Sequence, residues 1–520
     1  MNKVVGFPDN IRKAVESRKE QMLEKVKEQK GHIDNNGEIP SSFVLDCLRA
    51  NELGDGMLFA EMHRGKFVYN KTAQEWLVWR DHFWERDVMD EASIACEAVA
   101  QRYLQEKKWI DEKIGEAAKN QNKDELRRLE YLSRAIDRRV DRLRSNRGRS
   151  NALQFAHTCQ NALAIKGSEL DLNPWLLACA NGVIDLRTGK FRNGRQEDWI
   201  TKASKIKWEG LEAPAPTWER FLLEIQNDRQ DVVDYLQRLF GYAITGLTIE
   251  HILPVLYGQG RNGKSVLVET ICYVLGSLAG PIQSELLLDQ GRTKSSSGPS
   301  PDIMSLKGLR IAIASETDEG RKISSAQVKK LTGGDTLRGR NPHDKYEISF
   351  QPTHTLFLLT NHKPHAPADD FAFWERVHLI PFLMSFVDRE PKAENERPQD
   401  KTLPEKLKQE ASGILAWLVR GCLIWQEQGL NPPAIVKEAT AEYKRDEDLI
   451  ADFVEECCYV APDAWVNATD IYNVFQEWWE ENISKRVPSR KKFGTWFSRK
   501  FKKEKYSGTI RYLGVGILAS

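Results

Sequence analysis

The segment GQGRNGKS at residues 258–265 is the feature that most constrains what this chain can fold into. It has the GxxxxGKS spacing of a phosphate loop, in which a glycine-rich turn joins a buried strand to a helix N-terminus. The flanking residues fit, because 252–257 (ILPVLY) is a short apolar run and 266–275 (VLVETICYVL) is typical of a helix. Backbone N–H groups and the helix dipole then converge on one anion-binding position. The sequence therefore predicts a strand–loop–helix unit that binds a nucleoside triphosphate.

The cofactors that this loop predicts are ATP and Mg²⁺. The Lys264 ammonium is expected to reach the β- and γ-phosphates, and the Ser265 hydroxyl is expected to bind Mg²⁺. A fortuitous glycine-rich loop is the competing interpretation, and the flanking strand and helix disfavour it. The residues predicted to contact the nucleotide are Gly258, Gly260, Asn262, Gly263, Lys264 and Ser265.

Composition limits the classes of protein that remain. The formal net charge is +1, so any affinity for nucleic acid must come from local basic patches. There are eight cysteines and no CxxC pair, which argues against a zinc site or disulfide framework and favours a reducing cytoplasm. No run approaches the roughly 18 apolar residues of a membrane span. The N-terminus lacks the apolar segment of a signal peptide. We therefore expect a cytoplasmic protein without membrane contact.

The pattern along the chain predicts an ordered series of elements. Residues 1–30 are predicted to be helical and 31–42 to form a linker, whereas 51–87 alternate apolar and polar residues, as in short strands. Residues 88–150 are predicted to form a helical hairpin broken at 120–122, whose basic side chains form either a solvated face or an arm facing DNA or another subunit. The later predictions are two strands in 173–193, two amphipathic helices in 217–246, a loop at 387–401, and helices over 403–428 that end at Gly429.

Three features downstream of the phosphate loop separate a motor from a small-molecule kinase. The apolar strand 309–315 ends in Glu316, where a carboxylate at the end of the neighbouring strand would organise Mg²⁺ and polarise water. Asp318 and Glu319 are lower-ranked alternatives for the metal role. The strand 354–360 ends in Asn361, an amide suited to positioning water beside the γ-phosphate. Arg376 follows and suits a finger inserted into a neighbouring subunit's site. Each residue also has a purely structural interpretation. Glu316 could be an exposed residue at a strand end, Asn361 could cap its strand, and Arg376 could form a surface ion pair.

A basic hairpin is predicted between Glu316 and Asn361. Residues 341–344 (NPHD) read as its turn and 346–350 (YEISF) as its return strand. Such a loop, projecting into a channel, could grip successive phosphates of a single DNA strand, although a solvated charged loop remains the alternative. The residues predicted to contact DNA there are Arg338, Arg340, His343 and Lys345.

The C-terminal segment 446–520 has the pattern of a winged helix. Residues 448–460 are predicted to form one helix, Asn467 or Thr469 to cap the next, and Ser489 to start a third, followed by a hairpin turned at Ser507–Gly508. Ten Lys or Arg lie within 485–505, which favours a duplex groove over the alternative of a merely solvated basic helix. The residues predicted to contact DNA are Arg490, Lys491, Lys492, Arg499 and Lys500.

These motifs, in this order and spacing, resemble superfamily 3 helicases, and within them the phage- and plasmid-type primase-helicase family related to the poxvirus primase-helicase. Lys264, Glu316, Asn361 and Arg376 are 52, 45 and 15 residues apart, which matches the family's compact core. The matching text includes NGVIDLRTGKF, LYGQGRNGKSVL, LTNHKP and WERVHLIPF. The resemblance is strong over about residues 150–445 and looser over the segment before it. It implies a ring, usually a hexamer, that hydrolyses ATP between subunits and translocates 3′→5′ on single-stranded DNA.

The fold predicted on this basis is α/β: an AAA+-like P-loop ATPase core with a parallel sheet, flanked by an N-terminal helical and small-β region and a C-terminal winged helix. The predicted domains are an N-terminal region, a helical collar-type domain, the ATPase core, a helical lid and the winged helix, at 1–150, 151–248, 249–385, 386–445 and 446–520. Many family members carry a primase domain ahead of the helicase, but residues 1–150 show no paired acids for a polymerase-type metal site. We therefore expect a separate primase, and a remnant, origin-binding or partner-docking role for this region.

The sequence thus predicts a replicative DNA helicase of a mobile element, acting on single-stranded and forked DNA as a hexameric ring. An alternative of a different class is an initiator that binds origin DNA and uses ATP to switch assembly, with little unwinding of its own. A small-molecule P-loop kinase is a third class, which the hairpin and the trans arginine disfavour.

Overall fold

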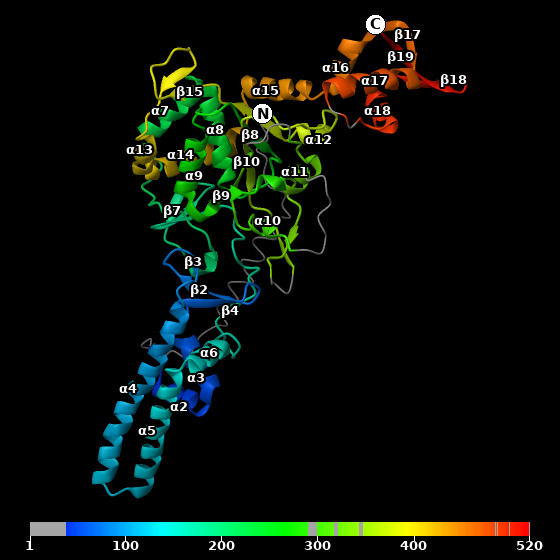
Figure 1. Cartoon of the computed structure of the whole chain (residues 1–520). Coiled ribbons are helices and arrows are strands. Elements are labelled where there is room, and N and C mark those ends of the chain that lie inside the picture. Colours follow the sequence, from blue (N-terminus) through cyan, green and yellow to red (C-terminus); the bar gives the residue numbers. More distant parts are fainter. Residues whose placement is uncertain are drawn as a thin grey trace. The chain divides into compact units, whose positions relative to one another are not determined.

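The computed structural model describes residues 38–289, 299–316, 321–342, 347–483, 485, 487–498 and 500–518, with Glu316 described for its backbone only. The chain divides into two compact units, Met1–Trp208 and Glu209–Ser520 (Figure 1). The predicted helix at 1–30 lies outside the described residues. No helix among those described is both long and apolar enough to cross a membrane. All eight cysteines are unpaired in this structure.

Among its described residues, the first unit is built mostly from five helices, and their shared core contains Leu58, Phe59 and Tyr103. The strands predicted from residue 51 onward are wrong for the first part of that segment, because Asn51–Met62 is a helix. Its two glycines resemble turn signals but serve close packing. A Cβ on Gly54 would lie 1.8 Å from the Cys47 carbonyl oxygen, and one on Gly56 would lie 2.4 Å from Phe155 Cβ. The helices are α2 Ser41–Arg49, α3 Asn51–Met62, α4 Glu91–Lys119, α5 Lys123–Leu143 and α6 Asn146–Ala156.

The predicted helical hairpin is confirmed by α4 and α5, which lie antiparallel along each other (Figure 1). The break falls where predicted, because the Asn122 side chain accepts a hydrogen bond from Glu125 N and caps α5. Lys107 on α4 pairs with Asp137 on α5 at 2.6 Å. Some of the basic side chains of this hairpin therefore hold its own two helices together.

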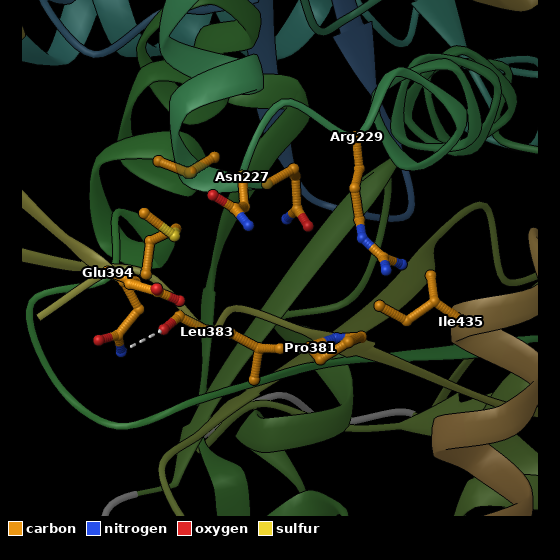
Figure 2. Close-up of a pocket in the computed structure, with 10 residues that line it drawn as sticks. Asn227, Arg229, Pro381, Leu383, Glu394 and Ile435 are labelled. Atoms are coloured by element: carbon orange, nitrogen blue, oxygen red, sulfur yellow. Dashed lines mark hydrogen bonds between the residues drawn. The ribbon is translucent and has the colours of Figure 1, made fainter.

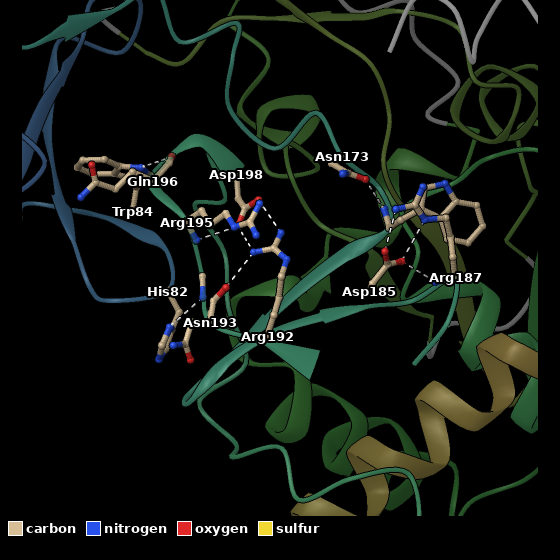
Figure 3. A network of polar contacts seen from close by, with 12 residues as sticks. His82, Trp84, Asn173, Asp185, Arg187, Arg192, Asn193, Arg195, Gln196 and Asp198 are labelled. Carbon is tan, nitrogen blue, oxygen red and sulfur yellow. Dashed lines mark hydrogen bonds and ion pairs between the residues drawn. The ribbon is translucent and has the colours of Figure 1, made fainter. Parts of the chain in front are cut away.

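Two small sheets complete the first unit. One has the order β3-β2-β1-β4 and the other is β5-β6-β7, so the segment 173–193 holds three strands instead of the two predicted. Figure 3 shows the polar network between them: Trp84 Nε1 donates to the Gln196 carbonyl at 3.1 Å, and Arg192 pairs with Asp198 at 2.7 Å. The strands are β1 Phe67–Asn70, β2 Glu75–Trp79, β3 Trp84–Arg86, β4 Ala164–Ile165, β5 Leu176–Cys179, β6 Gly182–Asp185 and β7 Lys190–Arg192.

The second unit is built around a five-stranded parallel sheet of order β14-β8-β13-β10-β9. Its central strands β8 and β13 are mostly buried and mostly apolar, as expected when helices cover both faces of a parallel sheet. The strands are β8 Leu253–Tyr257, β9 Ala279–Ile282, β10 Ile311–Glu316, β13 Thr355–Thr360 and β14 Val377–Pro381. The helices within this stretch are α9 Lys264–Leu275, α10 Pro301–Met304, α11 Ser325–Thr332 and α12 Phe371–Trp374.

Helices that precede and follow the sheet in sequence pack against each other. The two predicted helices at 217–246 are α7 Pro216–Ile225 and α8 Gln230–Ala243. After the sheet come α13 Leu403–Gln409, α14 Ala411–Gln428 and α15 Ala434–Asp446, and Gly429 ends α14 with φ 65°, as predicted. The predicted loop at 387–401 is partly strand, because β15 Ser385–Val387 pairs in parallel with β16 Glu396–Pro398.

The C-terminal segment has its own aromatic core, which includes Phe453, Phe475, Phe493 and Phe497. The helix predicted over 448–460 is shorter, because Cys458 is extended and starts a strand that pairs with Ile517. The hairpin predicted at Ser507–Gly508 is confirmed, and both of these residues have positive φ. The elements are α16 Leu449–Cys457, β17 Cys458–Asn467, α17 Ala468–Asn482, α18 Arg490–Phe497, β18 Lys503–Tyr506 and β19 Thr509–Ile517, with sheet order β17-β19-β18.

Candidate nucleotide site and DNA-facing elements

The predicted phosphate loop joins β8 to α9, so the expected strand–loop–helix unit is present. Gly263 precedes α9 with φ 85°, a left-handed conformation that glycine adopts without strain. A Cβ at this position would also lie 2.4 Å from Ile225 Cγ2. Asn262 is buried and its Nδ2 donates to the Phe382 carbonyl at 3.4 Å, which fixes the loop against the end of β14. Gly260 and Ser265 are exposed at the open side of the loop.

Lys264 and Asn361, 97 positions apart in sequence, meet at the end of the sheet. Lys264 is only 5% exposed, and its Nζ donates to the Gly258 carbonyl oxygen and, at 3.3 Å, to Asn361 Oδ1. Burial lowers the pKa of Lys264 to about 8. Among the described residues, the acceptors of this buried ammonium are neutral oxygens, so it is well placed to gain from a phosphate anion.

The strand register sets where the predicted carboxylate lies. Tyr257, Thr360 and Glu316 are level across β8, β13 and β10, so the loop, Asn361 and Glu316 share one edge of the sheet. The expectation that Glu316 ends the strand next to β8 is wrong, because β13 lies between them. With strands about 4.8 Å apart, the Glu316 backbone lies about 10 Å from the end of β8. Asn361 is therefore the nearer polar group. Asp318 and Glu319 lie outside the described residues.

Arg376 lies at the opposite edge of the same sheet. Its carbonyl accepts a hydrogen bond from Leu253 N at the start of β8, whereas the phosphate loop follows the end of that strand. Its Nε donates to Thr332 Oγ1 at 3.2 Å, and its Nη1 donates to the Ala372 carbonyl. A five-residue strand at about 3.3 Å per residue separates the two ends by about 16 Å. Arg376 is thus placed away from the phosphate loop of its own chain.

A cavity of about 260 Å³ lies beside the phosphate loop, and sequence reasoning did not find it (Figure 2). Its walls come from the α7–α8 connection, the chain after β14, the residues before β16 and the start of α15. They adjoin the loop directly, since Ile225 packs on Gly263 and Phe386 N donates to the Arg261 carbonyl at 2.7 Å. The lining residues are Ile225, Gln226, Asn227, Arg229, Pro381, Leu383, Met384, Glu394, Asn395 and Ile435.

The lining combines apolar side chains with amides and an arginine, and a mixed lining of this kind suits the base and ribose of a nucleotide. In Figure 2, Arg229 and Ile435 lie on one side of the cavity and Glu394 on the other. Asn395 Nδ2 donates to the Leu383 carbonyl at 3.1 Å, and this contact closes one wall. No sequence motif predicts these residues, because they come from four separate segments that only the fold brings together.

The predicted basic hairpin is present as β11 Leu337–Gly339 paired with β12 Ile348–Phe350. Arg338 is exposed on its first strand, and the backbone of Arg340 forms two hydrogen bonds with Ser300, at 2.8 and 3.2 Å. His343 and Lys345, predicted at the tip, lie outside the described residues. The hairpin is thus held to Ser300 at the end of its first strand, next to the predicted turn, with a basic side chain on the surface.

The predicted basic surface of the C-terminal segment lies along α18. Arg490, Lys491 and Lys492 are exposed in its first turn, while Phe493 and Phe497 face the core. Lys492 Nζ lies 4.9 Å from the Trp496 ring centroid. Lys500 is exposed but pairs with Asp448 at 2.7 Å, so its charge is partly compensated. Arg499 lies outside the described residues.

Comparisons with known proteins match both ends of the chain to one kind of protein. The family described as D5 N terminal like matches residues 56–227, and the family described as poxvirus D5 protein-like matches residues 445–512. The first match begins within the region that sequence reasoning had assigned only a loose resemblance. The resemblance to the poxvirus-type primase-helicase family is thereby confirmed.

Viral proteins are among the similar chains. "Putative helicase L207/L206" of Acanthamoeba polyphaga mimivirus is 31% identical over 336 residues, covering 62% of this chain and 35% of that protein. "Putative helicase 022R" of Frog virus 3 is 25% identical over 438 residues, covering 69% and 44%. "Putative primase C962R" of African swine fever virus (isolate Tick/Malawi/Lil 20-1/1983) is 24% identical over 333 residues, covering 61% and 34%. The chain thus spans less than half the length of these relatives.

Among solved structures, the apo C-terminal region of NrS-1 (305–718) aligns with a TM-score of 0.45 at 12% identity, covering 88% of this chain and 98% of that one.

Proposed function

We propose that this chain is the motor of an ATP-dependent DNA helicase, with an AAA+-like core that hydrolyses ATP between subunits of a ring. The contact between Lys264 and Asn361 at the end of the parallel sheet carries the proposal. It joins a phosphate-binding lysine to an amide that can sense the γ-phosphate. In this role Gly258, Gly260, Asn262, Gly263, Lys264 and Ser265 hold ATP and Mg²⁺, and Glu316 organises the metal and the attacking water. The nucleoside occupies the cavity beside the loop.

The helicase names of the viral relatives support the unwinding role, and the basic hairpin and C-terminal segment support a DNA substrate. Arg338, Arg340, His343 and Lys345 would contact single-stranded DNA in the ring channel. The C-terminal elements follow the order of a winged helix, in which Arg490, Lys491, Lys492, Arg499 and Lys500 would contact duplex phosphates. The substrate is single-stranded and forked DNA, the ring is a hexamer and the direction of movement is 3′→5′.

The test is ATP-dependent displacement of a fluorescent strand from a 3′-tailed and a 5′-tailed duplex, with an unlabelled trap strand present. We expect displacement from the 3′-tailed substrate alone, and none with Lys264→Ala. If the Lys264→Ala variant still displaces the strand, the loop that contains Lys264 is not the ATPase site of the motor.

The second candidate is an initiator that binds origin DNA, uses ATP to control assembly, and engages a separate primase or replication partner. The basic first turn of α18 favours it, because its charges lie on a helix outside the motor sheet. A sequence-specific footprint together with DNA-stimulated ATPase, but without displacement of either tailed strand, would support the initiator over the helicase.

A further inference from the structure

Large aromatic side chains are exposed on the C-terminal sheet, although the same segment buries many others. Trp465 on β17 is 53% exposed and Tyr506 on β18 is 59% exposed. Within the same segment, Phe453, Phe475 and Phe497 are fully buried. Exposed large apolar side chains that gather on one element are more informative than single ones, because they tend to mark a binding surface.

These aromatic side chains lie on the outer face of the sheet. Val466 and Tyr512 are directly opposite each other in the β17–β19 ladder, and both are buried. Side chains alternate between faces along a strand, so Trp465 and Arg511 point to the other face. Glu504 and Tyr506 share that face, because Glu504 is paired with Arg511 and Tyr506 lies two positions further along β18.

Arg511 links the two exposed rings. Its guanidinium lies 4.0 Å from the Tyr506 ring centroid and 5.5 Å from that of Trp465. It also forms an ion pair with Glu504, which fixes the plane of the guanidinium. Arg511 is only 20% exposed in its side chain, whereas each ring keeps more than half of its surface open. The stacking face, defined as Trp465, Tyr506 and Arg511, is therefore a set of planar groups positioned before any ligand arrives.

The charges along the edge strand β18 favour a nucleic acid. Lys503 and Lys505 are exposed and alternate with Glu504 and Tyr506, so they point to the other face of that strand, and Lys502 directly precedes it. The neighbouring acid Glu504 is paired with Arg511. The face is separate from α18, since Phe497 of α18 packs on Tyr512 at 4.8 Å between centroids, on the inner side of the sheet. Because β18 is an edge strand, a phosphate backbone that runs along this edge can contact the lysines while a base stacks on the rings.

We propose that the stacking face binds an unpaired nucleobase of single-stranded or forked DNA. The site extends the proposed DNA-binding role and rests on it. The α18 helix would contact the duplex, and the stacking face would contact an unpaired base next to that duplex. An aromatic ring stacks on any base, so this contact is tolerant of sequence.

The test uses the full chain and two oligonucleotides that carry 2-aminopurine: a single strand, and a fork with the probe at the first unpaired position. Stacking on an aromatic ring quenches 2-aminopurine fluorescence. We expect quenching on binding by the wild-type chain, with Tyr506→Phe within about twofold of its affinity. Tyr506→Ala should bind the single strand at least about fivefold more weakly, because one base stack is worth roughly 1–3 kcal/mol. Blunt-duplex affinity and ATPase should be unchanged in both variants.

Tyr506 is mostly exposed, so its replacement should leave the fold intact, and thermal unfolding checks this. Arg511→Lys is the second variant: it retains charge but loses the planar fork, and we expect reduced quenching at saturating DNA. Equal losses of single-strand affinity in Tyr506→Phe and Tyr506→Ala would contradict base stacking on the Tyr506 ring. Unaltered DNA binding in Tyr506→Ala would also overturn it and leave an apolar peptide as the ligand. If quenching follows the prediction but no strand is displaced, the stacking site stands and the helicase assignment fails.

Discussion

At the scale of single residues, the central cation of the candidate site is bonded to neutral groups among the described residues. The Lys264 ammonium is buried and bonded to one backbone carbonyl and one side-chain amide. Neither partner offsets the cost of removing the charge from water, and the pKa of Lys264 falls to about 8 for this reason. In the proposed function, a triphosphate would supply negative charge beside this ammonium. The protonation state of Lys264 would then change when the nucleotide binds.

The first prediction is that nucleotide binding takes up a proton above pH 8. Phosphate oxygens beside Lys264 favour its charged form, so the bound pKa lies above the free value of about 8. Affinity is then greatest below pH 8 and decreases as the pH rises through the free pKa. Calorimetry at pH 8.5 in two buffers of different ionisation enthalpy measures the uptake. Lys264→Arg is the control and should show none, since its guanidinium stays charged. Zero uptake by the wild-type chain would contradict the prediction.

The second prediction concerns the partner of Lys264. Asn361→Asp places a carboxylate about 3.3 Å from the ammonium, which would form an ion pair and repel the γ-phosphate. We expect ATP affinity to fall at least about tenfold, equivalent to about 1.4 kcal/mol. Asn361→Ala is the control that removes the amide without adding charge, and it should retain binding but lose turnover. Fluorescent-nucleotide titration and phosphate release measure the two effects. Equal ATP affinities in the Asn361→Asp and Asn361→Ala variants would show that residue 361 does not lie beside the bound phosphates.

Much of the residue-level site could be predicted, because each motif records a local requirement. A lysine after a glycine turn and a polar residue after a buried strand are readable from spacing alone, and Lys264 and Asn361 do meet. The order of strands could not be read this way. Sheet order is set by which faces the helices cover, so the sequence did not show that β13 separates Glu316 from β8. The cavity walls were likewise invisible, because Asn227, Pro381 and Asn395 become neighbours only after folding.

At the scale of elements, glycine was the least reliable signal. Gly54 and Gly56 fall in the segment 51–87 that was predicted to form short strands, yet they lie inside α3, where neighbouring backbone leaves no space for a Cβ. Gly429 and Ser507–Gly508 were read correctly, because each has a positive φ that favours glycine at a chain reversal. A sequence shows that a residue is glycine but not whether backbone conformation or close packing requires it.

The third prediction tests close packing at glycine by measuring the free energy of unfolding. A Cβ on Gly241 of α8 would lie 2.2 Å from Cys422 N of α14, so Gly241→Ala must push the two helices apart. We expect a loss of roughly 1–3 kcal/mol in the free energy of unfolding. Gly115 in α4 has open space around its Cβ position, and Gly115→Ala should stabilise that helix by about 0.5–1 kcal/mol. Urea unfolding followed by circular dichroism measures both, and stabilisation by Gly241→Ala would disprove the close crossing.

At the scale of the whole molecule, the sheet separates two parts of the proposed reaction. Lys264 and Asn361 lie at the ends of the strands, and Arg376 lies at their beginnings. One chain therefore does not bring Arg376 to its own phosphate loop. In a head-to-tail ring, the side of one subunit where its strands begin can face the side of the next subunit where the strands end. Arg376 would then complete the neighbouring subunit's site. This placement leads to a prediction about mixed assemblies.

The fourth prediction is that two inactive variants restore turnover when mixed. Arg376→Ala should bind ATP normally but lose about 10³-fold or more in turnover, as for a missing arginine finger. Glu316→Gln should also be inactive, because its own site lacks the carboxylate. In a ring assembled from equal amounts of both, some interfaces pair an intact Glu316 with an intact Arg376 from the adjacent subunit. If interfaces act independently, turnover should return to about one quarter of wild type. Phosphate release after co-assembly measures this, with each variant alone as the control. An arginine acting within its own chain predicts no recovery at any mixing ratio, because every subunit would then carry one defective part.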